Sequence, residues 1–221
     1  MRGRCDGQSR PIPPPLCHGP GRHGRIVDAV GFLSADGYFV SFMSGNTTRL
    51  GVALGTDVPR ALVPALLIAG FVSGVTLGAL VALRAGARRK PAVLGLVTLA
   101  LLGAALARVA GLHEAMLAGL VLAMGVLNNT FLRDGEVAVG LTYMTGALVK
   151  LGQGLARQLA GMSRQRGGGE WRSWALLWAG LLAGAVLGAF LQDRLPLGCL
   201  WIATGWAALM ATLGLTLPAE A

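Results

Sequence analysis

Charged residues are scarce in this sequence. Asp, Glu, Lys and Arg make up 13% of its 221 residues, against about 25% in soluble domains. Apolar side chains account for 54% of the chain, and the mean hydropathy is +0.62. A water-soluble domain of this length could not bury so much apolar surface, and disordered chains have the opposite composition. The composition therefore predicts an integral membrane protein.

Cysteine and histidine are also rare, with three of each. Three cysteines cannot form a paired framework, and the loose cluster of Cys5, Cys17, His18 and His23 lacks the spacing of a zinc site. The sequence contains no phosphate-binding loop, and its spans do not offer the serine and histidine of an intramembrane protease. We therefore predict no metal, no cofactor and no enzyme.

The few charges are mostly basic. The chain has 19 Lys and Arg against 10 Asp and Glu, a net charge of +9. In a soluble protein this excess would suggest nucleic acid, but no basic face here is interleaved with aromatic residues. In membrane proteins, basic residues collect in cytoplasmic loops and contact anionic lipid. We therefore predict that the partner is the lipid bilayer and not nucleic acid.

Long apolar runs provide the membrane segments. Residues 1–25 hold five Arg, five Pro and five Gly, and we predict that they form a disordered cytoplasmic tail. Beyond them, five runs approach or exceed the roughly 20 residues needed to cross the bilayer as helices. These runs are 61–83, 92–112, 115–132, 173–191 and 195–217. The predicted fold class is all-α, a polytopic transmembrane helical bundle of about six spans.

An internal repeat divides the chain into two halves. Residues 41–51 match residues 142–152 at a constant offset of 101, including Met, Gly, Leu, a hydroxyl and a basic residue. Two apolar spans follow each copy, so we predict membrane repeats at 26–112 and 115–217. Corresponding spans of the two halves carry stripes of small residues that favour close helix packing. The stripes are Gly70, Gly74 and Gly78 in the first half, and Gly180, Gly184 and Gly188 in the second.

Charge predicts how the halves are oriented. If each half crosses the membrane an odd number of times, the tail and the basic segments 84–90 and 157–172 all lie on one side. If each half instead crosses an even number of times, segment 84–90 lies on the opposite side of the membrane from the tail and segment 157–172. The enrichment of Lys and Arg in cytoplasmic loops favours the first arrangement. The halves are then inverted and the N-terminus is cytoplasmic.

Each half starts with an apolar region that is too long for one span. We predict a helix, then a re-entrant segment that is extended up to residues 43–45 or 144–146 and helical after them. Ser44 or Asn46 would cap the first half-helix, and the N–H groups of Asn46, Thr47 and Thr48 would favour an anion.

Two basic residues lie about one turn further along these half-helices. A charge within the membrane is costly, so Arg49 and Lys150 are functional candidates, although both could instead snorkel to the interface. Asp28, Asn128 and Asn129 could bind a polar solute or a proton, or could only hydrogen-bond the broken backbone. The predicted substrate-binding residues are Asp28, Ser44, Gly45, Asn46, Thr47, Arg49, Asn128, Asn129, Thr145, Gly146 and Lys150.

Three segments resemble a known family. Val-Asp-Ala-Val-Gly-Phe at 27–32, the motif at 42–51 and the motif at 140–152 are similar to the YoaK family, bacterial inner-membrane proteins of unknown function with about six spans. The resemblance covers residues 26–217 and implies a bacterial cytoplasmic membrane location. It supplies no substrate. In that family an apolar helix precedes the first motif, so we expect either that most of this helix is missing here or that the reading frame starts elsewhere.

The function that the sequence favours is transport of a small solute, with an anion as one candidate. Repeats that meet at a midplane site could alternate access by rocking against each other. The alternative is a non-transporting scaffold or assembly partner that binds other helices through its glycine stripes. A homo-oligomer is compatible with either function.

Overall fold

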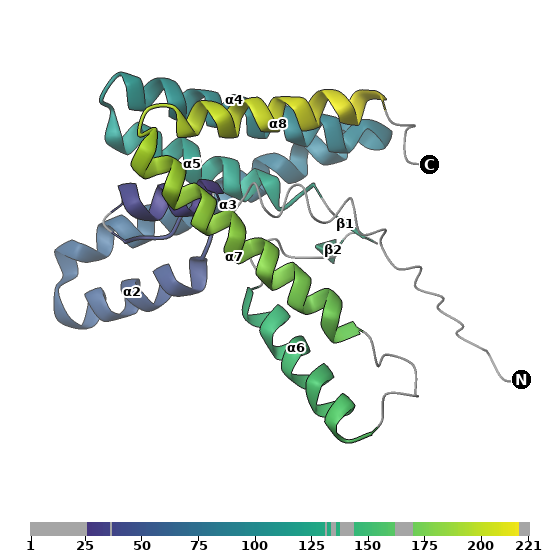
Figure 1. Cartoon of the computed structure of the whole chain (residues 1–221). Coiled ribbons are helices and arrows are strands. Elements are labelled where there is room, and N and C mark those ends of the chain that lie inside the picture. Colours follow the sequence, from purple (N-terminus) through teal and green to yellow (C-terminus); the bar gives the residue numbers. More distant parts are fainter. Residues whose placement is uncertain are drawn as a thin grey trace, which may run out of the picture.

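The computed structural model describes residues 26–35, 37–130, 132–133, 136–137, 144–161 and 170–216. The described part is a bundle of helices with one very short strand pair (Figure 1). In chain order it contains a helix at 26–34, α2 (Met43–Thr56), η1 (Val58–Ala61), α3 (Leu62–Ala85), η2 (Gly86–Arg88), α4 (Arg89–Val109), α5 (His113–Leu127), β1 (Leu132–Arg133), β2 (Glu136–Val137), α6 (Met144–Leu159), α7 (Glu170–Arg194) and α8 (Cys199–Thr216). The tail predicted at 1–25 lies outside the described residues.

Three helical runs of the described chain are long and apolar enough to cross a membrane. They are Val58–Val109, Trp171–Arg194 and Cys199–Thr216. The first has 52 residues, about 78 Å of helix, and contains both α3 and α4. The chain reverses between them at Gly86, whose φ of +52° is unfavourable for any residue with a side chain. Helix α5 is apolar but has only 15 residues. The predicted helical membrane bundle is therefore confirmed.

Helix α4 packs closely on both α5 and α8. Val97 and Leu101 of α4, Leu120 of α5 and Leu200 of α8 are at most 1% exposed and belong to one apolar cluster. Many large apolar side chains point outward instead, for example Leu83, which is 80% exposed. Such an outer surface is suited to lipid and not to water.

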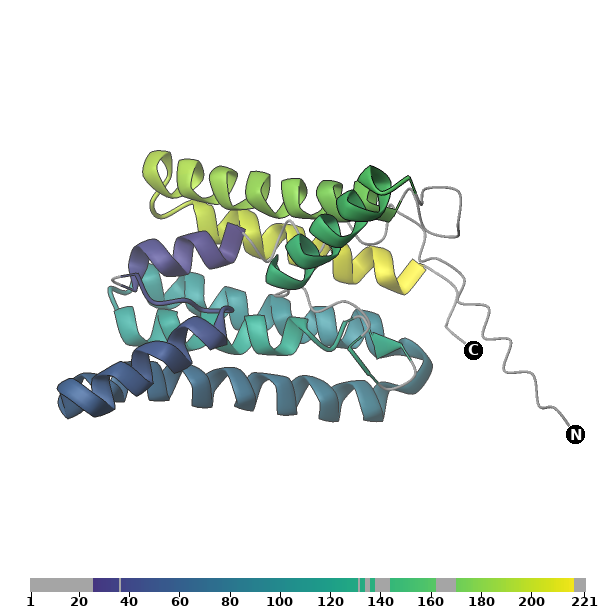
Figure 2. The same cartoon turned by 90° about the horizontal axis from the view of Figure 1, so that it is seen from below.

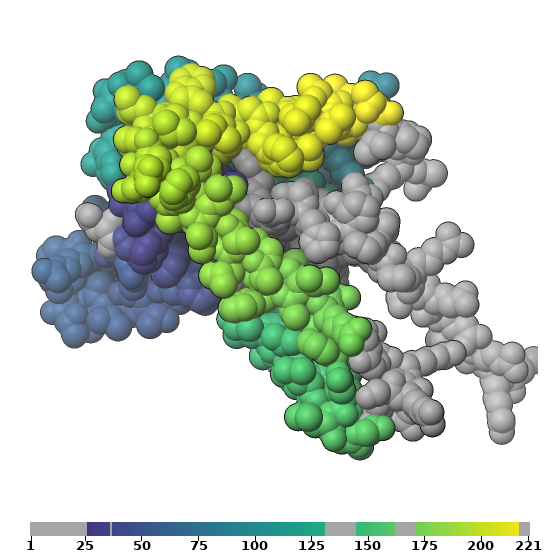
Figure 3. All heavy atoms as spheres, viewed as in Figure 1, coloured from purple at the N-terminus to yellow at the C-terminus, as the bar shows by residue number. Residues whose placement is uncertain are grey.

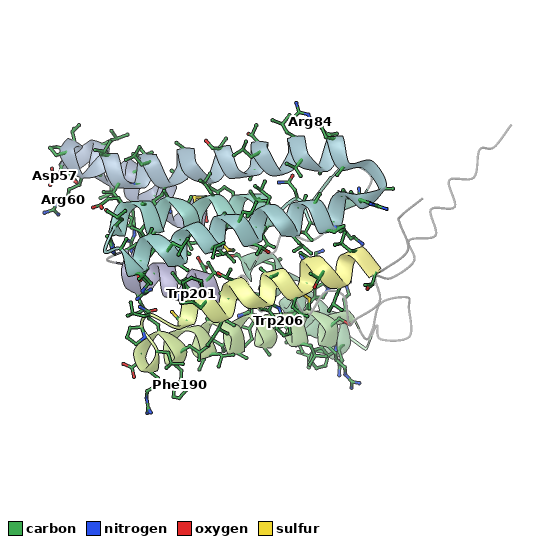
Figure 4. The ribbon with its side chains drawn as sticks, turned by 90° about the horizontal axis from the view of Figure 1, so that it is seen from above. Asp57, Arg60, Arg84, Phe190, Trp201 and Trp206 are labelled. Carbon is green, nitrogen blue, oxygen red and sulfur yellow. The ribbon has the colours of Figure 1, made fainter. Side chains whose placement is uncertain are left out.

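Equivalent helices of the two predicted halves run in opposite directions. Helix α3 runs from the end marked by Asp57 and Arg60 toward Arg84, whereas α7 finishes near Phe190 at the first end (Figure 4). Helix α8 runs from Trp201 toward Trp206, antiparallel to α4 (Figure 4). An inverted repeat requires such opposite directions.

Glycines allow helices from different halves to touch. A Cβ at Gly74 of α3 would lie 2.5 Å from the carbonyl oxygen of Leu122 and 3.2 Å from Cα of Gly125, both in α5. A Cβ at Gly188 of α7 would lie 2.8 Å from the backbone of Ile26. In the space-filling view α7 lies across this first helix, drawn in purple (Figure 3). Thus a glycine-striped helix of each half packs against the opening helix of the other half.

Candidate functional site

The matched motifs both begin helices. Helix α2 starts at Met43 and α6 starts at Met144, the two methionines that the repeat aligns. Both views place these two helix starts near the middle of the molecule, and from there the helices run toward opposite ends (Figures 1 and 2). The residues expected at the start of each half-helix therefore lie between the two ends of the molecule and not at either end.

The predicted start of the first half-helix is wrong by three residues. We expected extended chain up to Gly45 and a cap at Ser44 or Asn46, but α2 is helical from Met43 and its N-cap is Phe42, without a side-chain cap bond. The N–H of Asn46 already donates to the carbonyl of Phe42 at 3.3 Å. The amides that lack helical acceptors in such a first turn are those of Met43, Ser44 and Gly45.

Asn46 is bonded to the segment before the helix. Its side chain is 0% exposed, its Nδ2 donates to the carbonyl of Phe39 at 2.6 Å, and its Oδ1 accepts from the N–H of Phe39 at 3.2 Å. These two bonds pair both backbone groups of Phe39, which lies in an extended segment and not in a described strand. Asn46 therefore holds the extended segment against α2.

Asp28 also forms a hydrogen bond with the segment that precedes α2. Its side chain is 8% exposed, and Oδ1 accepts a hydrogen bond of 3.0 Å from the backbone N–H of Ser41. Gly37, with a φ of +79°, ends the preceding helix by donating its N–H to the carbonyl of Phe32 at 3.0 Å. The hydrogen bond to Ser41 fits the second of the two roles predicted for Asp28, which is to bond the broken backbone.

Arg49 returns toward the start of α2. Its guanidinium lies 4.8 Å from the ring centroid of Tyr38 and 5.7 Å from that of Phe39. Long helical side chains point toward the helix N-terminus, which explains how a residue in the second turn reaches the preceding segment. The half-buried positive charge is thus held beside aromatic faces by cation–π attraction.

Lys150 is oriented differently from Arg49. It is exposed, and its Nζ lies 4.1 Å from the ring centroid of Trp174 on α7. Helix α6 packs closely on α7, because a Cβ at Gly154 would clash with the side chain and backbone of Trp171. Lys150 is therefore held by the helix that follows it, whereas Arg49 is held by the segment that precedes it.

The remaining candidates divide into exposed and bonded side chains. Ser44, Thr47 and Thr145 are exposed, and the hydroxyl of Thr47 donates to the carbonyl of Met43 at 2.8 Å. Gly45 and Gly146 are partly buried in the first turns of their helices. Asn128 donates to the carbonyl of Met124 at 2.8 Å, and Asn129 donates to that of Val75 at 3.0 Å, which ties the end of α5 to α3.

Two buried polar atoms were missed from the sequence. The hydroxyl of Thr130 and Nη1 of Arg108 are both buried and have no hydrogen-bond partner among the described residues. Thr130 is 2% exposed and follows the two asparagines at the end of α5. Nothing in a single sequence marks a threonine of this kind, because its significance comes only from burial.

The arrangement favours binding of an anion or a neutral polar group. Two helix N-termini near the middle of the molecule present positive dipole ends, and Arg49 adds a full charge beside one of them. Within the described ranges, no three His, Cys, Asp or Glu side chains come together to hold a metal ion.

Comparison with known proteins identifies relatives but no activity. Residues 25–213 match the family described as Protein of unknown function (DUF1275). The chain is 38% identical over 194 residues to a UPF0700 transmembrane protein of Rhizobium meliloti (strain 1021), which covers 87% of this chain and 82% of that relative. No solved structure matches. The resemblance drawn from the sequence motifs is confirmed, and the chain belongs to the DUF1275 family of transmembrane proteins.

Proposed function

We propose that this protein carries a small anion or polar solute across the bacterial cytoplasmic membrane through the region where α2 and α6 begin. The observation that carries the proposal is the placement of the two matched helix starts near the middle of the molecule, with the helices leaving toward opposite ends (Figures 1 and 2). Broken helices that meet within the bilayer are a common way for transporters to build a solute site.

The packing of the half-helices supports movement of one repeat against the other. Helix α2 packs on α3, and α6 packs on α7, so each half-helix is attached to the next helix of its own half. The opposite directions of α3 and α7 support an inverted arrangement of these two units (Figure 4). Rocking of one unit against the other would expose the central region to each side in turn.

The alternative, a non-transporting scaffold or assembly partner, would use glycine stripes that are available to other proteins. Gly74 and Gly78 contact α5 and the turn after it, and Gly188 contacts the helix at 26–34. These three glycines are therefore used within the chain. The proposed transport involves no catalytic step.

Removing both basic candidates is expected to reduce anion transport. In proteoliposomes loaded with radiolabelled chloride or acetate, the double variant Arg49→Ala, Lys150→Ala should show at least a tenfold lower flux than the parent protein. The reason is that a charge-assisted contact is worth about 1.5–3 kcal/mol, and each tenfold change corresponds to about 1.4 kcal/mol. The thermal unfolding midpoint of each protein in detergent should be measured to show that folding is retained.

The matched control removes two arginines that lie elsewhere. Arg60 and Arg194 form ion pairs with Asp57 and Asp193 at 2.8 and 3.7 Å, so Arg60→Ala, Arg194→Ala loses the same charge away from the site. Its flux should equal that of the parent. Equal losses in the two double variants would contradict the site assignment, and equal fluxes in liposomes with and without parent protein would contradict transport of these anions.

Labelling of single cysteines should reveal which end of the helical bundle faces the cytoplasm. In a background without Cys5, Cys17 and Cys199, we expect Arg88→Cys to be protected from an impermeant thiol reagent in intact cells and Arg60→Cys to be labelled. Arg60 in η1 and Arg88 in η2 flank α3, whose two ends Arg60 and Arg84 mark in Figure 4, and the basic end should be cytoplasmic. Labelling of Arg88→Cys from outside would reverse the proposed orientation.

A further inference from the structure

The two ends of the bundle differ in the charges that lie beside their exposed arginines. At one end, Arg60 and Arg194 each have an aspartate beside them, with N–O distances of 2.8 and 3.7 Å. At the other end, which Arg84 marks in Figure 4, the end of α3, the turn η2 and the start of α4 carry Arg84, Arg88, Arg89 and Lys90, and residues 84–90 include no acidic residue. Arg84 and Arg88 are exposed, and no described residue forms an ion pair with either of them.

Apolar surface lies directly beside this basic turn. Leu83 is 80% exposed and Leu80 is 42% exposed, both in the last turns of α3 before Arg84. A soluble anion would use the arginines but gain nothing from the leucines. A molecule with an anionic head and an apolar tail would contact both, with its head at the turn and its acyl chains along α3.

Aromatic residues indicate that this end reaches the headgroup region. Helix α7 starts at the same end of the molecule, with Glu170 as its first residue, and both Trp171 and Trp174 lie in its first turns (Figures 2 and 4). Arg172 lies 5.6 Å from the ring centroid of Trp171. Tryptophan and basic residues together are typical of the boundary between hydrocarbon and headgroups.

We propose that the turn between α3 and α4 is a binding site for an anionic phospholipid, with Arg84 and Arg88 contacting the phosphate and Leu80 and Leu83 contacting the acyl chains. This inference does not depend on transport. Each exposed basic residue near a membrane surface raises the affinity for anionic lipid about fivefold. The two arginines together should therefore raise the affinity of the protein for anionic lipid on the order of 25-fold.

The test compares two lipids that differ only in the head. The full-length protein, purified in a maltoside detergent, is titrated with dioctanoyl phosphatidylglycerol or dioctanoyl phosphatidylcholine while its thermal unfolding midpoint is followed. A ligand that binds the folded state raises this midpoint. We expect the parent protein to bind phosphatidylglycerol more tightly than phosphatidylcholine. The double variant Arg84→Gln, Arg88→Gln should lower the affinity for phosphatidylglycerol on the order of 25-fold. Raising the salt concentration should weaken the binding of phosphatidylglycerol to the parent protein.

Two controls make the outcome decisive. Arg60→Gln, Arg194→Gln removes the same charge at the opposite end and should keep the preference for phosphatidylglycerol. Inorganic phosphate at the same concentration should leave the midpoint unchanged. The proposal is overturned if Arg84→Gln, Arg88→Gln keeps the full preference, if both double variants lose it equally, or if phosphate alone stabilises the protein as much as the lipid does.

Discussion

Replacing Gly74 by alanine is expected to destabilise the folded protein by about 2 kcal/mol, within the range measured when a methyl group is forced into a packed interface. The added Cβ would lie 2.5 Å from the carbonyl oxygen of Leu122 and 3.1 Å from its Cα. These are backbone atoms of α5, so no side chain can rotate away, and α3 and α5 must separate. The measurement is the unfolding midpoint of the purified protein in detergent.

Gly103 provides the matched control. It lies within α4, and a Cβ there would meet nothing within 4 Å. Gly103→Ala should therefore leave the midpoint unchanged or raise it slightly, because alanine is the better helix former. If both variants lowered the midpoint equally, the loss would come from helix composition in general, and the close crossing of α3 and α5 would not be its cause.

Much of the helical architecture could be predicted from apolar runs. The runs at 61–83 and 173–191 lie almost entirely within α3 and α7, and most of the run at 195–217 lies within α8. Such predictions succeed because a backbone in lipid must satisfy its own hydrogen bonds, so a long uncharged segment has few alternatives to a helix. The division into two repeats remains a prediction, which the aligned helix starts at Met43 and Met144 support.

The start of α2 could not be predicted, because two residues were interpreted by their usual local roles. The local pattern predicts an extended backbone at Gly45, but this glycine lies in the first turn of α2, where a Cβ would lie 2.6 Å from the ring of Phe42 and 3.2 Å from that of Phe39. The pattern also favours Asn46 as a helix cap, but its side chain bonds to Phe39, seven residues earlier. Both roles depend on how the preceding segment folds back, which no local pattern encodes.

The repeat also could not predict that Arg49 and Lys150 have different surroundings. The sequence treats them as equivalent residues of two copies. Tyr38 and Phe39 precede the first motif, whereas Val139 and Gly140 occupy the same positions before the second. With no ring at positions 139 and 140, the second basic residue lacks the counterparts of Tyr38 and Phe39, and it contacts Trp174 of α7 instead. The two copies have thus diverged in what holds their basic side chains.

Replacing Asn46 by leucine is expected to have an effect at least as large as that of Gly74→Ala, with a loss of about 3 kcal/mol in the free energy of unfolding. The side chain is 0% exposed and bonds both backbone groups of Phe39. Leaving a buried polar group without a partner costs about 1–3 kcal/mol, and here two groups lose their partner at once. The measurement is the unfolding midpoint, together with trypsin cleavage after Arg49 as a report on the segment before α2.

Asn128→Leu is the control that separates this role from a general intolerance of leucine. Asn128 is only partly buried, and its side-chain amide donates one hydrogen bond, to the carbonyl of Met124 one turn earlier. Its replacement removes one hydrogen bond of a partly exposed side chain, whereas Asn46→Leu removes two of a fully buried one, so the loss should be about 1 kcal/mol in equivalent free energy. If Asn46→Leu were as stable as the parent but lost anion flux, Asn46 would act on the solute and not on the segment that precedes α2.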